Sequence, residues 1–70
     1  MAFSNFLIGG KITEKSTQNG LKIEGRSGHN TSISTSYKPL SWSWDGGCVK
    51  VYLSNGETRL YSDYDEYTNA

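Results

Sequence analysis

The chain has 70 residues and carries seven Lys and Arg against seven Asp and Glu, so its formal net charge is zero. One small domain fits this length. Such a domain buries only about 60% of the surface of its unfolded chain, so a deep, enclosed active site is not expected. Zero net charge also counts against a protein whose main function is nucleic-acid binding, because such proteins usually carry an excess of basic residues.

The cysteine content and the N-terminus bear on the compartment. The single cysteine, Cys48, excludes an intramolecular disulfide, whereas small secreted domains usually need several. The apolar cluster Phe6-Leu7-Ile8 is too short for a signal peptide, and no stretch approaches the roughly 20 apolar residues of a membrane span. We therefore expect a cytoplasmic protein with no membrane association, and the initial Met favours a complete, free-standing product.

Three turn signals divide the chain into predicted strands. Asn19-Gly20 and Asn55-Gly56 favour type I′ hairpins, because both residues tolerate positive φ, and Asp45-Gly46-Gly47 is a third turn signal. The runs between them are rich in Val, Ile, Tyr, Trp and Thr, which suit a pleated sheet, and no window keeps a helical period. Five strands are predicted, at about residues 4–16, 21–27, 37–44, 48–54 and 57–62.

The first predicted hairpin is bent. A turn at Asn19-Gly20 pairs Lys15 with Glu24, and Gly9-Gly10 interrupts the first strand with a bulge or sharp bend. The apolar face of this hairpin is predicted to hold Phe6, Ile8, Ile12, Leu21 and Ile23. The polar segment 27–36 that follows is predicted to be a long loop or a poorly ordered connection.

The last three strands form a predicted meander with two-residue turns. A turn at Asn55-Gly56 places Val51 opposite Leu60, and a turn within Asp45–Gly47 places Trp42 beside Val51. One face is then predicted to hold Leu40, Trp42, Trp44, Val49, Val51, Leu53 and Leu60. The other face is predicted to hold Ser41, Ser43, Cys48, Lys50, Tyr52, Arg59, Tyr61 and Asp63.

These elements predict an all-β domain over residues 1–62. Its bent N-terminal hairpin packs on the three-stranded meander, which gives a small SH3-like barrel or a half-open roll. The acidic, tyrosine-containing tail 63–70 is predicted either to form one helical turn capped by Ser62 or to be disordered.

The residues do not form a recognisable catalytic or metal-binding set. The candidate base, His29, falls in the predicted loop, and a dyad with Cys48 would require that loop to fold over the glycine turn. One Cys and one His are too few for a zinc site, and the tail carboxylates lack the glycine and spacing of a calcium loop. Gly25-Arg26-Ser27-Gly28 is interpreted as a simple turn. We expect no enzymatic activity, no metal and no cofactor.

The polar face of the meander and the tail are the predicted partner-binding region. Tyr and Arg are enriched among the residues that dominate binding energy at interfaces. The candidate residues are Lys50, Tyr52, Arg59, Tyr61, Asp63, Tyr64, Asp65, Glu66 and Tyr67. Trp42 and Trp44 are assigned to the core, and a binding platform built on them is the alternative.

Two functions from different classes remain open. The first is a non-enzymatic protein-binding module that acts stoichiometrically as an inhibitor or adaptor of a larger protein. Small inhibitors encoded by phages or mobile elements share this profile. The alternative is a small β-barrel that binds single-stranded nucleic acid through basic and aromatic residues. Its groove would use Lys11, Lys22, Arg26, Lys50 and Arg59. Exposed edge strands also allow a homo-oligomer with either function.

Overall fold

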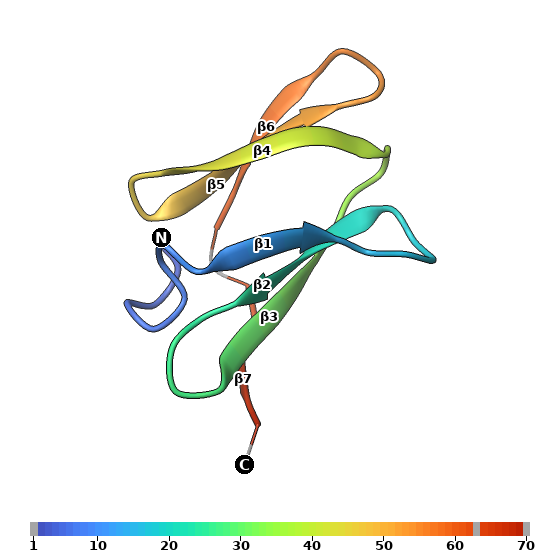
Figure 1. The fold of residues 1–70 in the computed structure, drawn as a ribbon. Coiled ribbons are helices and arrows are strands. Elements are labelled where there is room, and N and C mark those ends of the chain that lie inside the picture. The colour runs from blue at the N-terminus through green and yellow to red at the C-terminus, as the bar shows by residue number, and fades with distance from the viewer. Residues whose placement is uncertain (1, 63, 70) are drawn as a thin grey trace.

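The computed structural model describes residues 2–62 and 64–69, which form seven strands in two antiparallel sheets (Figure 1). The four-stranded sheet has the order β1-β2-β3-β7, with β1 at Lys11–Glu14, β2 at Gly20–Glu24, β3 at His29–Ser34 and β7 at Tyr67–Thr68. The three-stranded sheet has the order β4-β5-β6, with β4 at Pro39–Asp45, β5 at Cys48–Leu53 and β6 at Thr58–Tyr61. The all-β prediction is confirmed, and the two sheets form a half-open roll.

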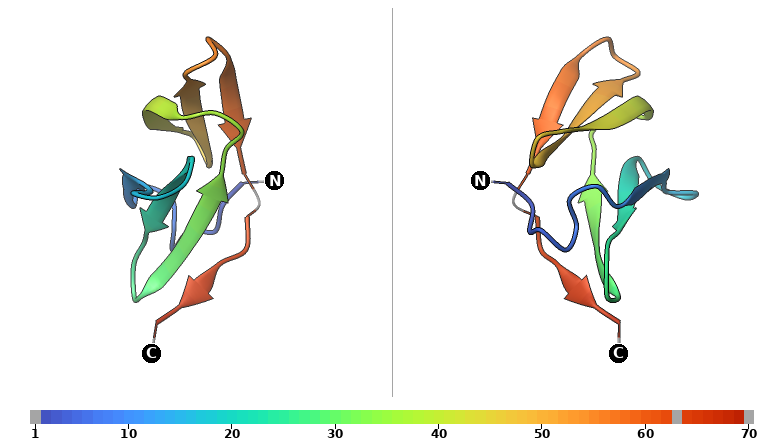
Figure 2. Two further views of the ribbon diagram at one scale, coloured as in Figure 1. Left: turned by 90° about the vertical axis from the view of Figure 1, so that its right-hand side faces the viewer. Right: turned by 60° about the vertical axis from the view of Figure 1, so that its left-hand side comes forward.

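The core lies between the two sheets, which sit one above the other (Figures 1 and 2). Buried and exposed residues alternate along β2, β3 and β5, because successive side chains of a strand point to opposite faces. The N-terminal segment before β1 adds two further buried side chains. The core comprises Phe3, Leu7, Leu21, Ile23, Ile33, Val49, Val51 and Leu53. The described residues include no helix long and apolar enough to cross a membrane.

The segment predicted as a long loop, residues 27–36, instead contains β3, a central strand of the four-stranded sheet. The prediction was wrong because the polar residues of this segment concealed the alternation of buried and exposed side chains that is typical of a strand. Thr31 and Ile33 are buried against the core, while Ser32 and Ser34, which alternate with them, are exposed. The predicted simple turn at residues 25–28 is present and joins β2 to β3, with Gly25 N–H donating to the carbonyl of His29.

The described part of the C-terminal tail, residues 64–69, forms neither of the predicted states. Tyr67 and Thr68 form β7, which pairs antiparallel with the start of β3 at Asn30 and His29. The backbone N–H of Asn69 also donates to the carbonyl of Gly28, at 3.0 Å. The tail therefore supplies β7, the short fourth strand of this sheet.

The predicted register of the first hairpin is wrong by four residues. Lys11, not Lys15, pairs with Glu24, and Lys15 N–H closes a longer loop by donating to Gly20 O. The shift is even, so Ile12 still lies on the inward face opposite Ile23. The first strand is also shorter than predicted. Residues before β1 form turns, so Leu7 is buried and Phe6 is 46% exposed.

The predicted pairing of β4 with β5 is largely confirmed. Trp44 pairs with Val49, Trp42 pairs with Val51, and the turn between the strands has two residues. A bulge between Pro39 and Ser41 displaces the remaining pair. Pro39 rather than Leu40 therefore faces Leu53 and is buried.

The predicted register of β5 with β6 is wrong by one residue. The hairpin loop has three residues, Ser54-Asn55-Gly56, because the Leu53 N–H donates to the carbonyl of Glu57 across them, and Gly56 adopts a φ of +90°. Lys50 therefore pairs with Leu60, and Val49 pairs with Tyr61. An odd shift reverses the faces of a strand, so Leu60 is exposed and Tyr61 turns toward the core.

Candidate partner-binding surface

The three-stranded sheet presents a regular surface on the side away from the core. Val49, Val51 and Leu53 of β5 are buried, so the alternate residues Lys50 and Tyr52 point outward. The register gives each of them two cross-strand neighbours. We call this surface the outer face and define it by Ser41, Ser43, Lys50, Tyr52, Thr58 and Leu60.

Two large apolar side chains of the outer face are open to solvent. Tyr52 is 44% exposed and lies between Ser41 and Thr58, which are too small to cover its ring. Leu60 is 60% exposed beside Lys50. Leu40, at the bulge next to Ser41, is 53% exposed.

The outer face is hollowed rather than flat. A shallow depression of about 410 Å³ opens over its strands, and its lining includes the half-buried Trp42. The other lining residues are Ser41, Ser43, Lys50, Tyr52 and Thr58. Exposed apolar groups around a depression, with one cation and several hydroxyls, match the composition of protein-binding patches.

The predicted partner-binding residues do not form one strip. Lys50 and Tyr52 lie together on the outer face, as the alternation predicted. Arg59 does not face Tyr52, and Tyr61 does not face Lys50, because the one-residue shift pairs them with Val51 and Val49. The prediction that Arg59 and Tyr61 share a face with Lys50 and Tyr52 is therefore wrong.

Arg59 is engaged within its own hairpin. Its guanidinium donates to the Glu57 carboxylate, with Nη2 to Oε2 at 2.9 Å, and Glu57 is also held by Asn55. The hydrogen bond from Arg59 lowers the pKa of Glu57, and the one from Asn55 adds to it. Both side chains of the ion pair are about half exposed, so the pair orders the loop more than it stabilises the fold.

Tyr61 and Tyr64 pack on the core instead of presenting a contact surface. Tyr64 stacks on Phe3 at a centroid distance of 6.2 Å, and Tyr61 lies 6.1 Å from Tyr64. Partial burial raises the pKa of Tyr64, and the neighbouring Tyr61 raises it further. These two rings anchor the chain as it passes from β6 to the tail.

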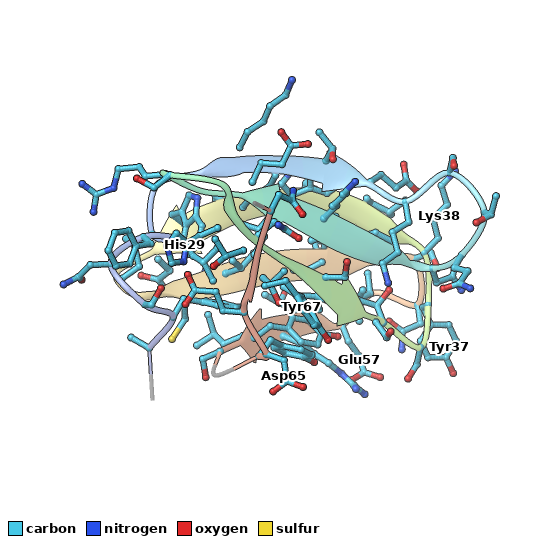
Figure 3. The ribbon with its side chains drawn as sticks, turned by 90° about the horizontal axis from the view of Figure 1, so that it is seen from below. His29, Tyr37, Lys38, Glu57, Asp65 and Tyr67 are labelled. Atoms are coloured by element: carbon cyan, nitrogen blue, oxygen red, sulfur yellow. The ribbon has the colours of Figure 1, made fainter. Side chains whose placement is uncertain are left out.

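The rest of the tail is held against β3 (Figure 3). The Glu66 carboxylate pairs with Nδ1 of His29, and the Thr31 hydroxyl donates to the carbonyl of Asp65. Tyr67 is 58% exposed and lies on the four-stranded sheet, away from Tyr52. Asp63, also in the predicted set, lies outside the described residues.

His29 is not the exposed loop residue that the sequence predicted. It begins β3, is partly buried, and uses its ring to hold Glu66 and to stack on Phe6. Within residues 2–62 and 64–69, no three His, Cys, Asp or Glu side chains cluster in a way that could hold a metal ion.

The two tryptophans pack at the margin of the core. Trp44 meets Phe3 edge to face at 5.7 Å, and its indole Nε1–H donates to the carbonyl of Gly10 at 2.9 Å. Trp42 is also half-buried against the core. The core assignment is therefore the better description of both.

Sequence reasoning missed Leu40 and Leu60 as surface residues. Leu40 is exposed because of the bulge between Pro39 and Ser41, and Leu60 is exposed because the loop at Asn55-Gly56 has three residues, the next most common length after two.

Comparisons with protein-family models, with curated proteins and with solved structures found no match to this chain.

Proposed function

We propose that this protein is a non-enzymatic binding module that captures a protein partner through the outer face and acts stoichiometrically, as an inhibitor or adaptor. The observation that carries the proposal is the exposure of Tyr52 and Leu60 next to Lys50, with Tyr52 and Lys50 lining the depression. A small domain with a marginal core has little reason to leave such side chains in water unless a partner covers them.

The outer face also has the mixed chemistry that protein partners require. Tyr52 offers a rigid apolar ring with a hydroxyl at its end, and Lys50 offers one positive charge. The serine and threonine hydroxyls around them can pair with backbone groups of a partner. Tyr52 lies on β5, the central strand of its sheet, so a partner that covers the outer face would exclude water from it.

Nucleic-acid binding has less support, because the basic residues are dispersed. Lys22 is exposed between the buried Leu21 and Ile23, so it lies on the far side of the four-stranded sheet from the core. Lys50 lies on the outer face of the other sheet, and Arg59 is paired with Glu57. One strand of nucleic acid could not contact all three along a single groove.

The test is capture from a lysate of the source cells by four immobilised proteins: the wild type, Tyr52→Ala, Leu60→Ser and Tyr67→Ala. Tyr67 is the matched control, because it is an exposed tyrosine on the other sheet. We expect one protein to be retained stoichiometrically by the wild type and by Tyr67→Ala, and to be lost with both outer-face variants. Retention should survive nuclease treatment.

Two outcomes would overturn the proposal. Equal capture by all four proteins would show that the outer face is not the binding surface. Loss of capture after nuclease treatment, or recovery of nucleic acid in place of a protein, would favour the nucleic-acid alternative.

A further inference from the structure

Strand β4 is the longest of the described strands, and it lies at an edge of its sheet. It has seven residues and pairs on one side only, with β5. An unpaired edge presents a row of backbone donors and acceptors that can template pairing with another strand. The other edges are shorter, with four residues in β1 and in β6 and two in β7.

The geometry of the β4–β5 hairpin shows which backbone groups of β4 are not hydrogen-bonded to β5. The pair that closes a two-residue turn exchanges hydrogen bonds, so Asp45 bonds to Cys48 across the turn. Bonding then alternates along the strand, and Ser43 also bonds to β5. The N–H and C=O groups of Trp42 and Trp44 therefore point away from β5, where the described part of the chain gives them no backbone partner.

The side chains of β4 do not protect this edge. Proteins usually blunt edges with charged residues, proline or bulges. Lys11 and Glu14 begin and end β1, and Arg59 lies within β6. In β4, Pro39 and the bulge lie at the first end and the charged Asp45 lies at the last, and the stretch from Leu40 to Trp44 between them carries no charge.

The regular part of β4 is complementary to itself. It runs from Ser41 to Asp45, past the bulge, so its midpoint is Ser43. Antiparallel pairing about Ser43 places Trp42 opposite Trp44 of a second copy, which matches the free backbone groups and forms four hydrogen bonds. Asp45 then lies opposite Ser41 of the second copy, so no like charges meet.

Burial of the tryptophan indoles would stabilise this pairing further. Trp42 and Trp44 are only half-buried within one molecule, at the open margin of the core. Pairing about Ser43 would bring the indoles of the two copies together across the new strand boundary. A two-fold arrangement also closes on itself, so it stops at two copies.

We propose that β4 is a homodimer interface, through which two copies of this chain join their three-stranded sheets into one continuous six-stranded sheet with its two-fold axis at Ser43. The outer faces of both copies then lie side by side on the same side of this sheet. The inference does not depend on the proposed function, because it rests on the edge of the sheet and not on its face.

The first test is a measurement of mass in solution by light scattering, from micromolar to millimolar concentration. We expect a species of twice the 7.8 kDa chain mass. In Ser43→Lys, two like charges face each other at the axis and should weaken the dimer at least about tenfold. Ser41→Lys is the matched control, because it faces Asp45 of the second copy and should leave dimerisation intact or stronger.

The second test is cross-linking by a single cysteine, with Cys48→Ser as the background. Side chains of a non-hydrogen-bonded antiparallel pair lie close together, as Ser43 does with its own copy in this register. With oxidised glutathione as the oxidant, Ser43→Cys should give a disulfide-linked dimer and Ser41→Cys should not. A monomeric wild type at millimolar concentration, equal effects of the two lysines, or equal cross-linking at both positions would overturn the proposal.

Discussion

The ring of Phe6 stacks on the imidazole of His29 with a centroid distance of 4.2 Å and an interplanar angle of 6°. This contact joins three parts of the chain that are distant in sequence. Phe6 belongs to the N-terminal segment, His29 begins β3, and Nδ1 of His29 holds Glu66 of the tail. Arg26 closes the group by donating to the carbonyl of Asn5 and lying 5.8 Å above the Phe6 ring. The stack therefore connects both ends of the chain to the four-stranded sheet.

The first prediction concerns the hold of His29 on the tail. In Glu66→Ala, the tail should detach locally, because β7 has only two paired residues. Hydrogen exchange at the backbone amide of Asn69, which donates to Gly28, should become faster. The global free energy of unfolding should fall by only about 1 kcal/mol or less, because the pair is partly exposed.

The control for this prediction is Glu57→Ala, which removes the ion pair with Arg59 in the other sheet. Exchange at Asn69 should then stay at the wild-type rate, while the β5–β6 loop becomes more mobile. If Glu66→Ala and Glu57→Ala leave the tail amides equally protected, the pair with His29 does not hold the tail.

The second prediction concerns Gly25, which follows β2 and lies against the N-terminal segment. A Cβ at this position would lie 2.0 Å from the carbonyl oxygen of Phe6 and 2.9 Å from Cα of Leu7. Both contacts are with backbone, so one of the two segments must shift, and Gly25→Ala should cost about 2 kcal/mol or more. Chemical denaturation measures this loss.

Gly56→Asn is the control for Gly25→Ala. Gly56 has a φ of +90° and no neighbouring atom within 4 Å of an added Cβ, and Asn tolerates positive φ better than other residues. Its unfolding free energy should therefore stay much closer to that of the wild type. Similar losses in the two variants would mean that the close approach to Phe6 is not what requires glycine at position 25.

The fold was predictable where residue type and period agree. The alternation of Val49 and Val51 with Lys50 identifies β5 and its inward face, and the two glycines after Asp45 fix its register with β4. β3 was missed because serine and threonine also favour loops, so the burial of Thr31 and Ile33 in a segment rich in serine leaves only a weak signal. β7 was missed because two residues carry no period at all.

The candidate surface was predictable only in part, because it depends on register. Lys50 and Tyr52 were placed correctly by their own strand. Arg59 and Leu60 exchanged faces because the loop at Asn55-Gly56 has three residues instead of two, and one residue inverts the whole strand. The roles of Glu66 and Tyr64 could not be read from the sequence, since they depend on contacts with His29 and Phe3, which are distant in sequence.

The third prediction tests this register through two leucines of the same hairpin. Leu53 is fully buried, so Leu53→Ala should destabilise the protein by about 2–5 kcal/mol. Leu60 is 60% exposed, so Leu60→Ala should change stability by only about 0.5 kcal/mol. Equilibrium denaturation distinguishes the two. A large loss for Leu60→Ala would restore the register in which it belongs to the core.

The fourth prediction concerns the alkaline limit of stability. Burial raises the pKa of Tyr64 above its ordinary value of 10.0, so the folded state holds this proton more tightly than the unfolded chain does. Stability from this group is therefore complete below pH 10 and should decline as the pH rises from 10 through the raised pKa of the folded state. Phenylalanine has no proton to lose, so Tyr64→Phe should remove this part of the decline and keep the stacking on Phe3. Tyr67→Phe, at a tyrosine that is 58% exposed, is the matched control for the loss of one phenolic hydroxyl. The measurement is the free energy of unfolding between pH 8 and pH 12, and identical profiles for wild type and Tyr64→Phe would show that the Tyr64 hydroxyl is not held in a drier environment by the fold.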